Sequence, residues 1–116
     1  MKLPNVDAAS VPRLKITGYL LSKTHRDGRH KAAFFLSFGF TARAWQTLAE
    51  ALLKHAADHP VARSEETSFG MRYVVEGTMS TPDGRTPRIR SVWFIDIDNT
   101  APRFVTAYRL EGASND

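Results

Sequence analysis

The stretch RIRSVWFIDID, residues 88–98, decides the fold because mostly apolar side chains alternate along it with a set that includes charged ones. One alternate set is mostly apolar and predicts the face that packs on the core: Ile89, Ser91, Trp93, Ile95 and Ile97. The other set points away from that face: Arg88, Arg90, Val92, Phe94 and Asp96. A period of two residues is typical of a strand that is covered on one side. The stretch therefore predicts a long strand of an antiparallel sheet.

Two further segments with the same period flank this strand. Arg72 to Met79 (RYVVEGTM) precedes it across the turn Pro82-Asp83-Gly84, and Arg103 to Leu110 (RFVTAYRL) follows it across Asn99 to Pro102. A weaker strand is predicted at Val61 to Glu66. In the last strand, alternation is expected to place four residues on one side: Phe104, Thr106, Tyr108 and Leu110. The segments predict a three- to four-stranded antiparallel meander.

The N-terminal half has the period of helices. Thr41 is predicted to cap the clearest helix, which ends near Ala57. One apolar stripe of this helix is expected to pack on the apolar face of residues 88–98: Trp45, Leu48, Ala49, Leu52 and Ala56. His55 is expected on its exposed side. A shorter helix is predicted over Leu14 to Leu21, with Pro12 in its first turn, and the alternative is that this run is partly a strand. Another short helix is predicted at His30 to Phe38.

Helices followed by strands predict an α+β protein, with N-terminal helices packed on the antiparallel sheet. A chain of 116 residues suits one core, so we predict a single domain, 1–116, with helices at about 12–57 and the sheet at about 61–110. The absence of cysteine excludes disulfides and thiolate metal sites. No apolar run is long enough to span a bilayer, so we expect a soluble protein with no membrane partner.

Positive charge is concentrated in the N-terminal half of a chain whose net charge is +4. Residues 1–60 hold nine Lys and Arg against four Asp and Glu, whereas residues 61–116 hold seven against eight. Residues 23–31 (KTHRDGRHK) contain four of the cations and two histidines around the turn signal Asp27-Gly28. Such a loop predicts a site for a phosphate and for proton transfer. The plainer interpretation is a solvated basic loop.

Six segments carry a resemblance to known families: YLL (19–21), GRHKA (28–32), FFLSFGFT (34–41), RYVVEG (72–77), RSVWFI (90–95) and PRFVTAYRL (102–110). Over roughly residues 2–110 they resemble a family of small bacterial proteins catalogued as a domain of unknown function. The layout also resembles the barnase/EndoU/colicin/RelE-like superfamily of ribonuclease toxins, in which helices precede a four-stranded antiparallel sheet. That resemblance implies metal-free RNA cleavage by His, Lys, Arg, Ser/Thr and Tyr side chains of the sheet and the preceding helix.

Metal-free RNA cleavage needs a base for the ribose 2′-OH, cations for the charge on the phosphate, and an acid for the leaving 5′-oxygen. We predict His30 as the acid or base, and Lys31 and Arg90 as the phosphate partners. Thr106 and Tyr108 are predicted to orient the nucleotide or to help move a proton. The plainer interpretation keeps these five as ordinary surface or core side chains.

A second group of residues is predicted to bind substrate: His25, Arg26 and Arg29. No cofactor and no metal site are expected. A zinc site built from the four histidines is the weaker alternative, because the sequence has neither cysteine nor an HExxH spacing.

These residues together predict a small metal-independent endoribonuclease-like toxin or effector domain. RNA and an antitoxin or immunity protein are the predicted partners. We expect it in the cytoplasm, either of the cell that makes it or of a target cell into which it is delivered. The alternative is a non-catalytic module that binds nucleic acid or protein through the basic loop Lys23 to Lys31.

Overall fold

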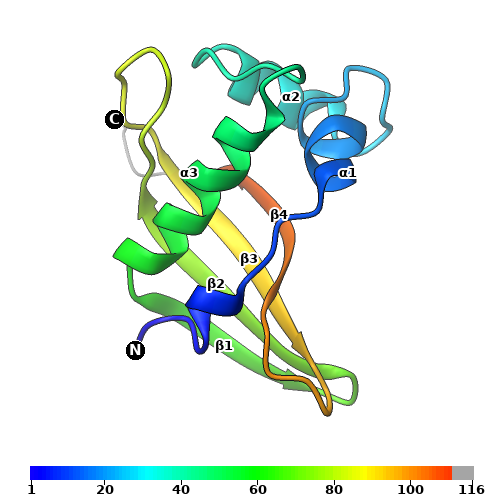
Figure 1. Ribbon diagram of the computed structural model, residues 1–116, viewed down its shortest axis with the longest axis vertical. Helices are drawn as coiled ribbons and strands as arrows, with labels where there is room; N and C mark the ends of the chain where they lie inside the picture. The colour runs from blue at the N-terminus through cyan, green and yellow to red at the C-terminus, as the bar shows by residue number, and fades with distance from the viewer. Residues whose placement is uncertain (111–116) are drawn as a thin grey trace.

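The structure is a computed structural model, and it describes residues 1–110. Helical segments come first and strands follow, as Figure 1 shows. The helical segments are η1 (Val6–Ala8), α1 (Arg13–Lys15), η2 (Ile16–Leu20), α2 (Arg29–Leu36) and α3 (Trp45–Asp58). The strands are β1 (Val61–Thr67), β2 (Gly70–Thr78), β3 (Arg88–Asp96) and β4 (Arg103–Arg109). The predicted α+β class is confirmed. No helix within the described range is both long and apolar enough to cross a membrane.

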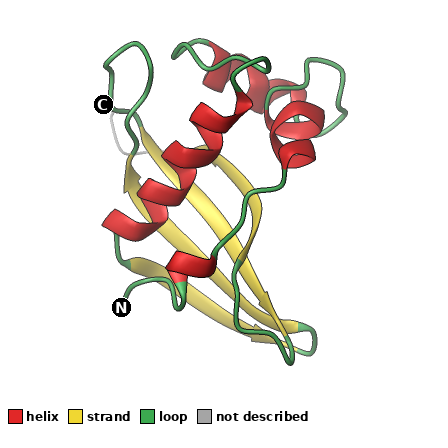
Figure 2. Ribbon diagram, viewed as in Figure 1, coloured by secondary structure: helices red, strands yellow, loops and turns green. Residues whose placement is uncertain are grey.

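The four strands form one antiparallel sheet in the order β1-β2-β3-β4, and α3 lies across one face of it (Figure 2). Ile89, Ser91 and Trp93 are fully buried on this face, as their alternation predicts. The apolar side chains become more exposed toward the end of residues 88–98, where Ile95 is half-buried and Ile97 is 64% exposed. The reason is that the sheet extends past the layer of helices at the lower right of Figure 1.

Helix α3 contributes to the core together with the other helical segments. Leu48, Ala49, Leu52 and Ala56 are buried as predicted, whereas Trp45 is half-buried. The helix begins at Trp45 rather than next to Thr41. Thr41 Oγ1 instead accepts a hydrogen bond of 3.1 Å from the backbone N–H of Ala44, which closes the turn before the helix.

His55 is in the core, so its predicted place on the exposed side of α3 is wrong. Only 2% of the residue is exposed, and burial lowers the pKa of its imidazole to about 4. Its Nδ1 lies 3.0 Å from Ser91 Oγ and its Nε2 lies 3.2 Å from the carbonyl oxygen of Gly77. Trp93 Nε1 donates to the same Ser91 oxygen at 2.8 Å. A neutral ring protonated on Nε2 satisfies all three bonds, because Ser91 then donates to Nδ1.

Candidate functional site

Strand β4 contains a bulge that decides which of its side chains reach the candidate site. Trp93 pairs with Phe104 and Val92 pairs with Thr106, so Val105 is an extra residue. Phe104 therefore faces the core, where its ring centroid lies 5.4 Å from that of Trp93. Thr106 faces the opposite side of the sheet with Val92. The prediction that Phe104 shares a side with Thr106 is wrong, because alternation breaks at the bulge.

Arg90 and Tyr108 are direct cross-strand partners on this second face of the sheet. Arg90 Nε and Nη2 contact Glu76 Oε2 at 2.7 and 2.6 Å, and Arg90 Nη1 reaches the Tyr108 hydroxyl at 3.5 Å. Glu76 on β2 is the residue opposite Arg90. Because Glu76 already pairs with its charge, Arg90 is better placed to hold Tyr108 than to attract a phosphate.

Lys31 reaches the sheet from α2 and is held between two tyrosines. Its Nζ donates to the Tyr19 hydroxyl at 2.9 Å, and it lies 5.2 and 5.9 Å from the ring centroids of Tyr19 and Tyr108. The Tyr19 hydroxyl lies 2.8 Å from Thr106 Oγ1. No acidic side chain among residues 1–110 forms an ion pair with Lys31, so its charge is available to an anion. We call Tyr19, Lys31, Thr106 and Tyr108 the lysine–hydroxyl cluster.

Tyr19 was not predicted as a site residue, and its position depends on an unusual turn. The segment Ile16–Leu20 is a π-helix, closed by a hydrogen bond of 2.8 Å from the N–H of Leu21 to the carbonyl oxygen of Ile16. Such turns often mark functional sites. The loop of residues 23–31 packs tightly on this turn at Gly28, where a Cβ would collide with the carbonyl oxygen of Tyr19. The sequence feature that could have indicated an irregular turn before Tyr19 is Gly18, because glycine is a poor helix former.

His25 shapes the basic loop. Its Nδ1 accepts the backbone N–H groups of Asp27 and Gly28, both at 3.0 Å, and its ring packs edge-on against Tyr19 with the centroids 5.0 Å apart. This nitrogen is therefore occupied within the loop. Arg26 and Arg29, the other predicted binding residues, are exposed and do not join the lysine–hydroxyl cluster.

His30 lies beside the lysine–hydroxyl cluster. It is exposed in the first turn of α2 and lines a hollow of about 300 Å³ together with Lys31, Phe34, Tyr108 and Arg109. Its imidazole has no hydrogen-bond partner in the described part of the chain. Four of the five predicted catalytic residues thus form one connected group, and the fifth borders the same hollow.

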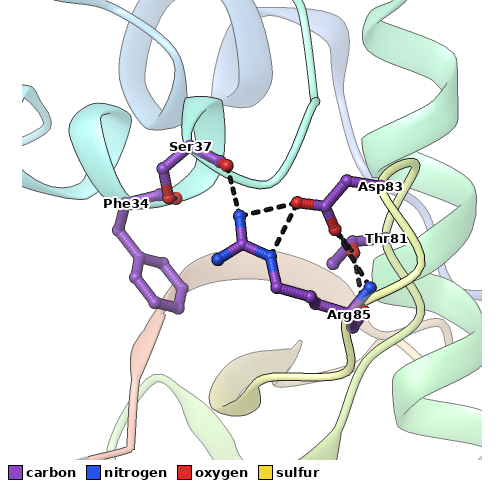
Figure 3. Close-up of polar contacts among 5 residues, drawn as sticks. All are labelled: Phe34, Ser37, Thr81, Asp83 and Arg85. Atoms are coloured by element: carbon purple, nitrogen blue, oxygen red, sulfur yellow. Dashed lines mark hydrogen bonds and ion pairs between the residues drawn. The ribbon is translucent and has the colours of Figure 1, made fainter.

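The other end of α2 is anchored by the loop between β2 and β3. Figure 3 shows Arg85 between Asp83 and the backbone of Ser37, where its Nη2 donates to the Ser37 carbonyl oxygen at 2.7 Å. The N–H of Asp83 donates to the carbonyl oxygen of Phe38 at 3.2 Å. Arg85 Nε donates to the Asp83 carboxylate at 2.8 Å, and hydrogen bonds from Arg85 lower the pKa of Asp83 to about 2. We call these contacts the α2 clamp.

The chain is a small α+β protein, in which N-terminal helices meet the edge of a four-stranded antiparallel sheet. The chain belongs to the family described as Domain of unknown function (DUF6883), which it matches over residues 2–111. The prediction of such a family is confirmed. No curated protein matches the sequence.

A solved structure with a similar fold is a chain of the contact-dependent growth inhibition toxin–immunity protein complex from Klebsiella pneumoniae 342. The TM-score is 0.72 at 16% sequence identity, and the match covers 92% of this chain and 97% of that chain. The name of the complex covers both of its components. At this identity the likeness concerns the fold.

Proposed function

We propose that this chain is a toxin or effector domain that cleaves RNA without a metal ion at the lysine–hydroxyl cluster. The observation that carries the proposal is the Lys31 ammonium group, which lies between two tyrosines and has no acidic partner among the described residues. The fold is similar to that of a chain of a toxin–immunity protein complex, and a toxin is one of the two components that this name covers. His30 supplies the titratable group that such a reaction needs.

The reaction forms a bond between the ribose 2′-oxygen and phosphorus and breaks the bond from phosphorus to the 5′-oxygen. A base takes the proton of the 2′-OH and an acid gives a proton to the leaving oxygen, which yields a 2′,3′-cyclic phosphate and a free 5′-OH. His30 serves one of these transfers and the hydroxyl of Tyr108, a residue that lines the same hollow, serves the other. Lys31 neutralises the charge that develops on the phosphate oxygens.

The hydroxyl network positions the lysine. Because Tyr19 accepts from Lys31, its own proton is directed toward Thr106, so three groups fix one another. Arg90 contacts the lysine–hydroxyl cluster through Tyr108. In this proposal Lys31 is a catalytic residue, whereas Tyr19, Thr106 and Arg90 are positioning residues.

The test is cleavage of total bacterial RNA by the purified protein in EDTA, with the new ends analysed for 2′,3′-cyclic phosphate. Lys31→Ala should lower the rate by about 100-fold or more, the scale of a lost charge-stabilising group, at an unchanged melting temperature. Lys54→Ala is the matched control, because Lys54 is an exposed lysine on α3 whose partner within residues 1–110 is Asp58, on the same surface. Cleavage that EDTA abolishes, or that survives Lys31→Ala, would reject the proposal.

A binding module without catalysis is the second candidate, and the exposed cations of the basic loop favour it. Arg26 and Arg29 form no ion pair with any residue in the range 1–110. If the chain only binds RNA through these two arginines, the RNA stays intact and its affinity for the protein falls steeply as salt is added.

As a toxin domain, the chain would instead be paired with an immunity protein and act on RNA in the cytoplasm of a target cell.

A further inference from the structure

Strand β1 leaves one edge of the sheet open. The strand order β1-β2-β3-β4 puts it at an end of the sheet, and within residues 1–110 no strand pairs with its outer side. At its start, beside the N-terminus in Figure 1, the N–H of Val61 donates to the carbonyl oxygen of Met1 at 2.6 Å. Residues 62–66, beyond this contact, are exposed. Such an edge presents backbone N–H and C=O groups with which another strand can pair.

The opposite edge of the sheet, at β4, is partly covered by the N-terminal segment. The N–H of Ser10 donates to the carbonyl oxygen of Pro102 at 3.1 Å, and the N–H of Phe104 donates to the carbonyl oxygen of Ser10 at 3.0 Å. Strand β4 also supplies Thr106 and Tyr108 to the lysine–hydroxyl cluster. The open edge and the cluster therefore lie at opposite ends of the strand order, and a strand added to β1 leaves the cluster accessible.

The sequence of β1 is complementary in charge to itself. Arg63 and Glu65 are separated by one residue, so they lie on the same face of the strand. If a second copy of β1 pairs antiparallel with Ser64 opposite Ser64, Arg63 of each copy stands opposite Glu65 of the other. Charged side chains usually protect an edge from pairing. In this register, however, the opposed charges are unlike, and each such cross-strand pair stabilises a sheet.

The two charges have little compensation within one chain. Arg63 forms no ion pair with any of residues 1–110. Glu65 contacts Arg72 at 3.9 Å, the longest ion pair formed in this range, and its side chain is 60% exposed. An exposed contact of this length contributes little to stability. A second copy would give Arg63 a counter-charge and would place Glu65 between two arginines.

Exposed apolar side chains border both ends of the strand. Met1 is bound beside Val61 at the start of β1, and Phe69 lies in the turn that follows Thr67 at its end. Met1 is 70% exposed and Phe69 is 75% exposed. With Ser64 opposite Ser64, the start of β1 in one copy meets the end of β1 in the other. Met1 of one copy and Phe69 of the other therefore come to the same end of the paired strands, where their burial favours association.

We propose that two copies of this chain associate through β1, antiparallel and with Ser64 at the two-fold axis. The two four-stranded sheets then form one continuous sheet, with a lysine–hydroxyl cluster near each outer edge. One pair of strands is a small interface, in the range of transient complexes, so the dimer forms in proportion to protein concentration. This association does not depend on the proposed RNA cleavage.

The experiment measures the average mass of the whole chain by sedimentation equilibrium over a series of protein concentrations. We expect the mass of the wild type to rise from that of the monomer toward twice that value. Arg63→Glu opposes glutamates at both charge pairs, and Glu65→Arg opposes arginines at both. Each variant should weaken the association by about tenfold or more, because like charges facing each other are costly. Mixing the two variants restores unlike charges at both pairs, so the mixture should associate again.

Arg43→Glu is the matched control, because it makes the same charge change at an exposed arginine before α3 and should associate as the wild type does. All three variants lie on the surface and should keep the melting temperature of the wild type. A wild type that stays monomeric up to its solubility limit would overturn the proposal. Association that Arg63→Glu leaves unchanged, or a mixture that associates no better than either variant alone, would overturn it as well.

Discussion

Acid should destabilise this protein through His55, and the size of the effect follows from its burial. The pKa of the imidazole is about 4 in the folded chain, against 6.5 in the unfolded chain. As the pH falls below 6.5 the unfolded chain takes up a proton, whereas the folded chain does not until about pH 4. The free energy of unfolding therefore decreases across this window, by about 3 kcal/mol when complete and by about 2 kcal/mol between pH 7 and pH 4.5.

The charged groups around His55 do not reverse this sign. His59, whose ring centroid lies 5.1 Å away, also lowers the pKa of His55, and the hydrogen bond to Gly77 and the charge of Asp58 only partly raise it. Denaturant unfolding at a series of pH values measures the effect in the wild type and in His55→Gln. The variant should be less stable at pH 7 and should lose about 2 kcal/mol less than the wild type between pH 7 and 4.5. His30→Gln, at an exposed histidine, should follow the wild type. Parallel curves for His55→Gln and the wild type would refute the reasoning.

Three further outcomes are expected from the packing. Trp93→Ala should cost about 3–5 kcal/mol in denaturant unfolding, and Trp45→Ala clearly less, because Trp93 is fully buried and Trp45 half-buried; equal losses would contradict the assignment of the core. Gly28→Ala should cost about 1–3 kcal/mol, since its Cβ meets backbone that cannot move aside; an unchanged melting temperature would argue against the close approach of the loop. Arg85→Ala opens the α2 clamp, so amide hydrogen exchange should accelerate in α2 and remain unchanged in α3.

The order of the elements could be predicted because each segment keeps its hydrophobic period, about 3.6 residues in a helix and 2 in a strand, over enough residues to be recognised. The strands at 72–79, 88–98 and 103–110 appear in the structure with ends shifted by at most two residues. His55 was misplaced although it follows Leu48 by seven residues and Leu52 by three, the spacing of the buried stripe. The prediction placed this histidine on the exposed side of the helix, whereas Ser91 and Gly77 satisfy both of its nitrogens inside the core.

The candidate site was predicted less completely than the fold, because it depends on two local irregularities. Tyr108 beside Arg90 requires the register of β4, which the bulge at Val105 sets. Tyr19 requires the π-turn and the close approach of the basic loop. Neither irregularity repeats along the sequence, so the hydrophobic pattern does not reveal it. Lys31 and Thr106 were predicted from residue type, but the tyrosine that links them was not.

Because the α2 clamp fixes one end of a short helix, a small rotation at that end displaces the residues at the other end. The clamp holds the carboxyl end of α2 at Ser37, and Lys31 lies near the amino end, about 9 Å away for six residues at 1.5 Å each. A tilt of about 6° around the clamp would move the backbone of Lys31 by about 1 Å, a displacement large enough to cost a catalytic group about 100-fold in rate. Sequence changes in the loop at residues 81–85 can therefore tune the site without touching a substrate.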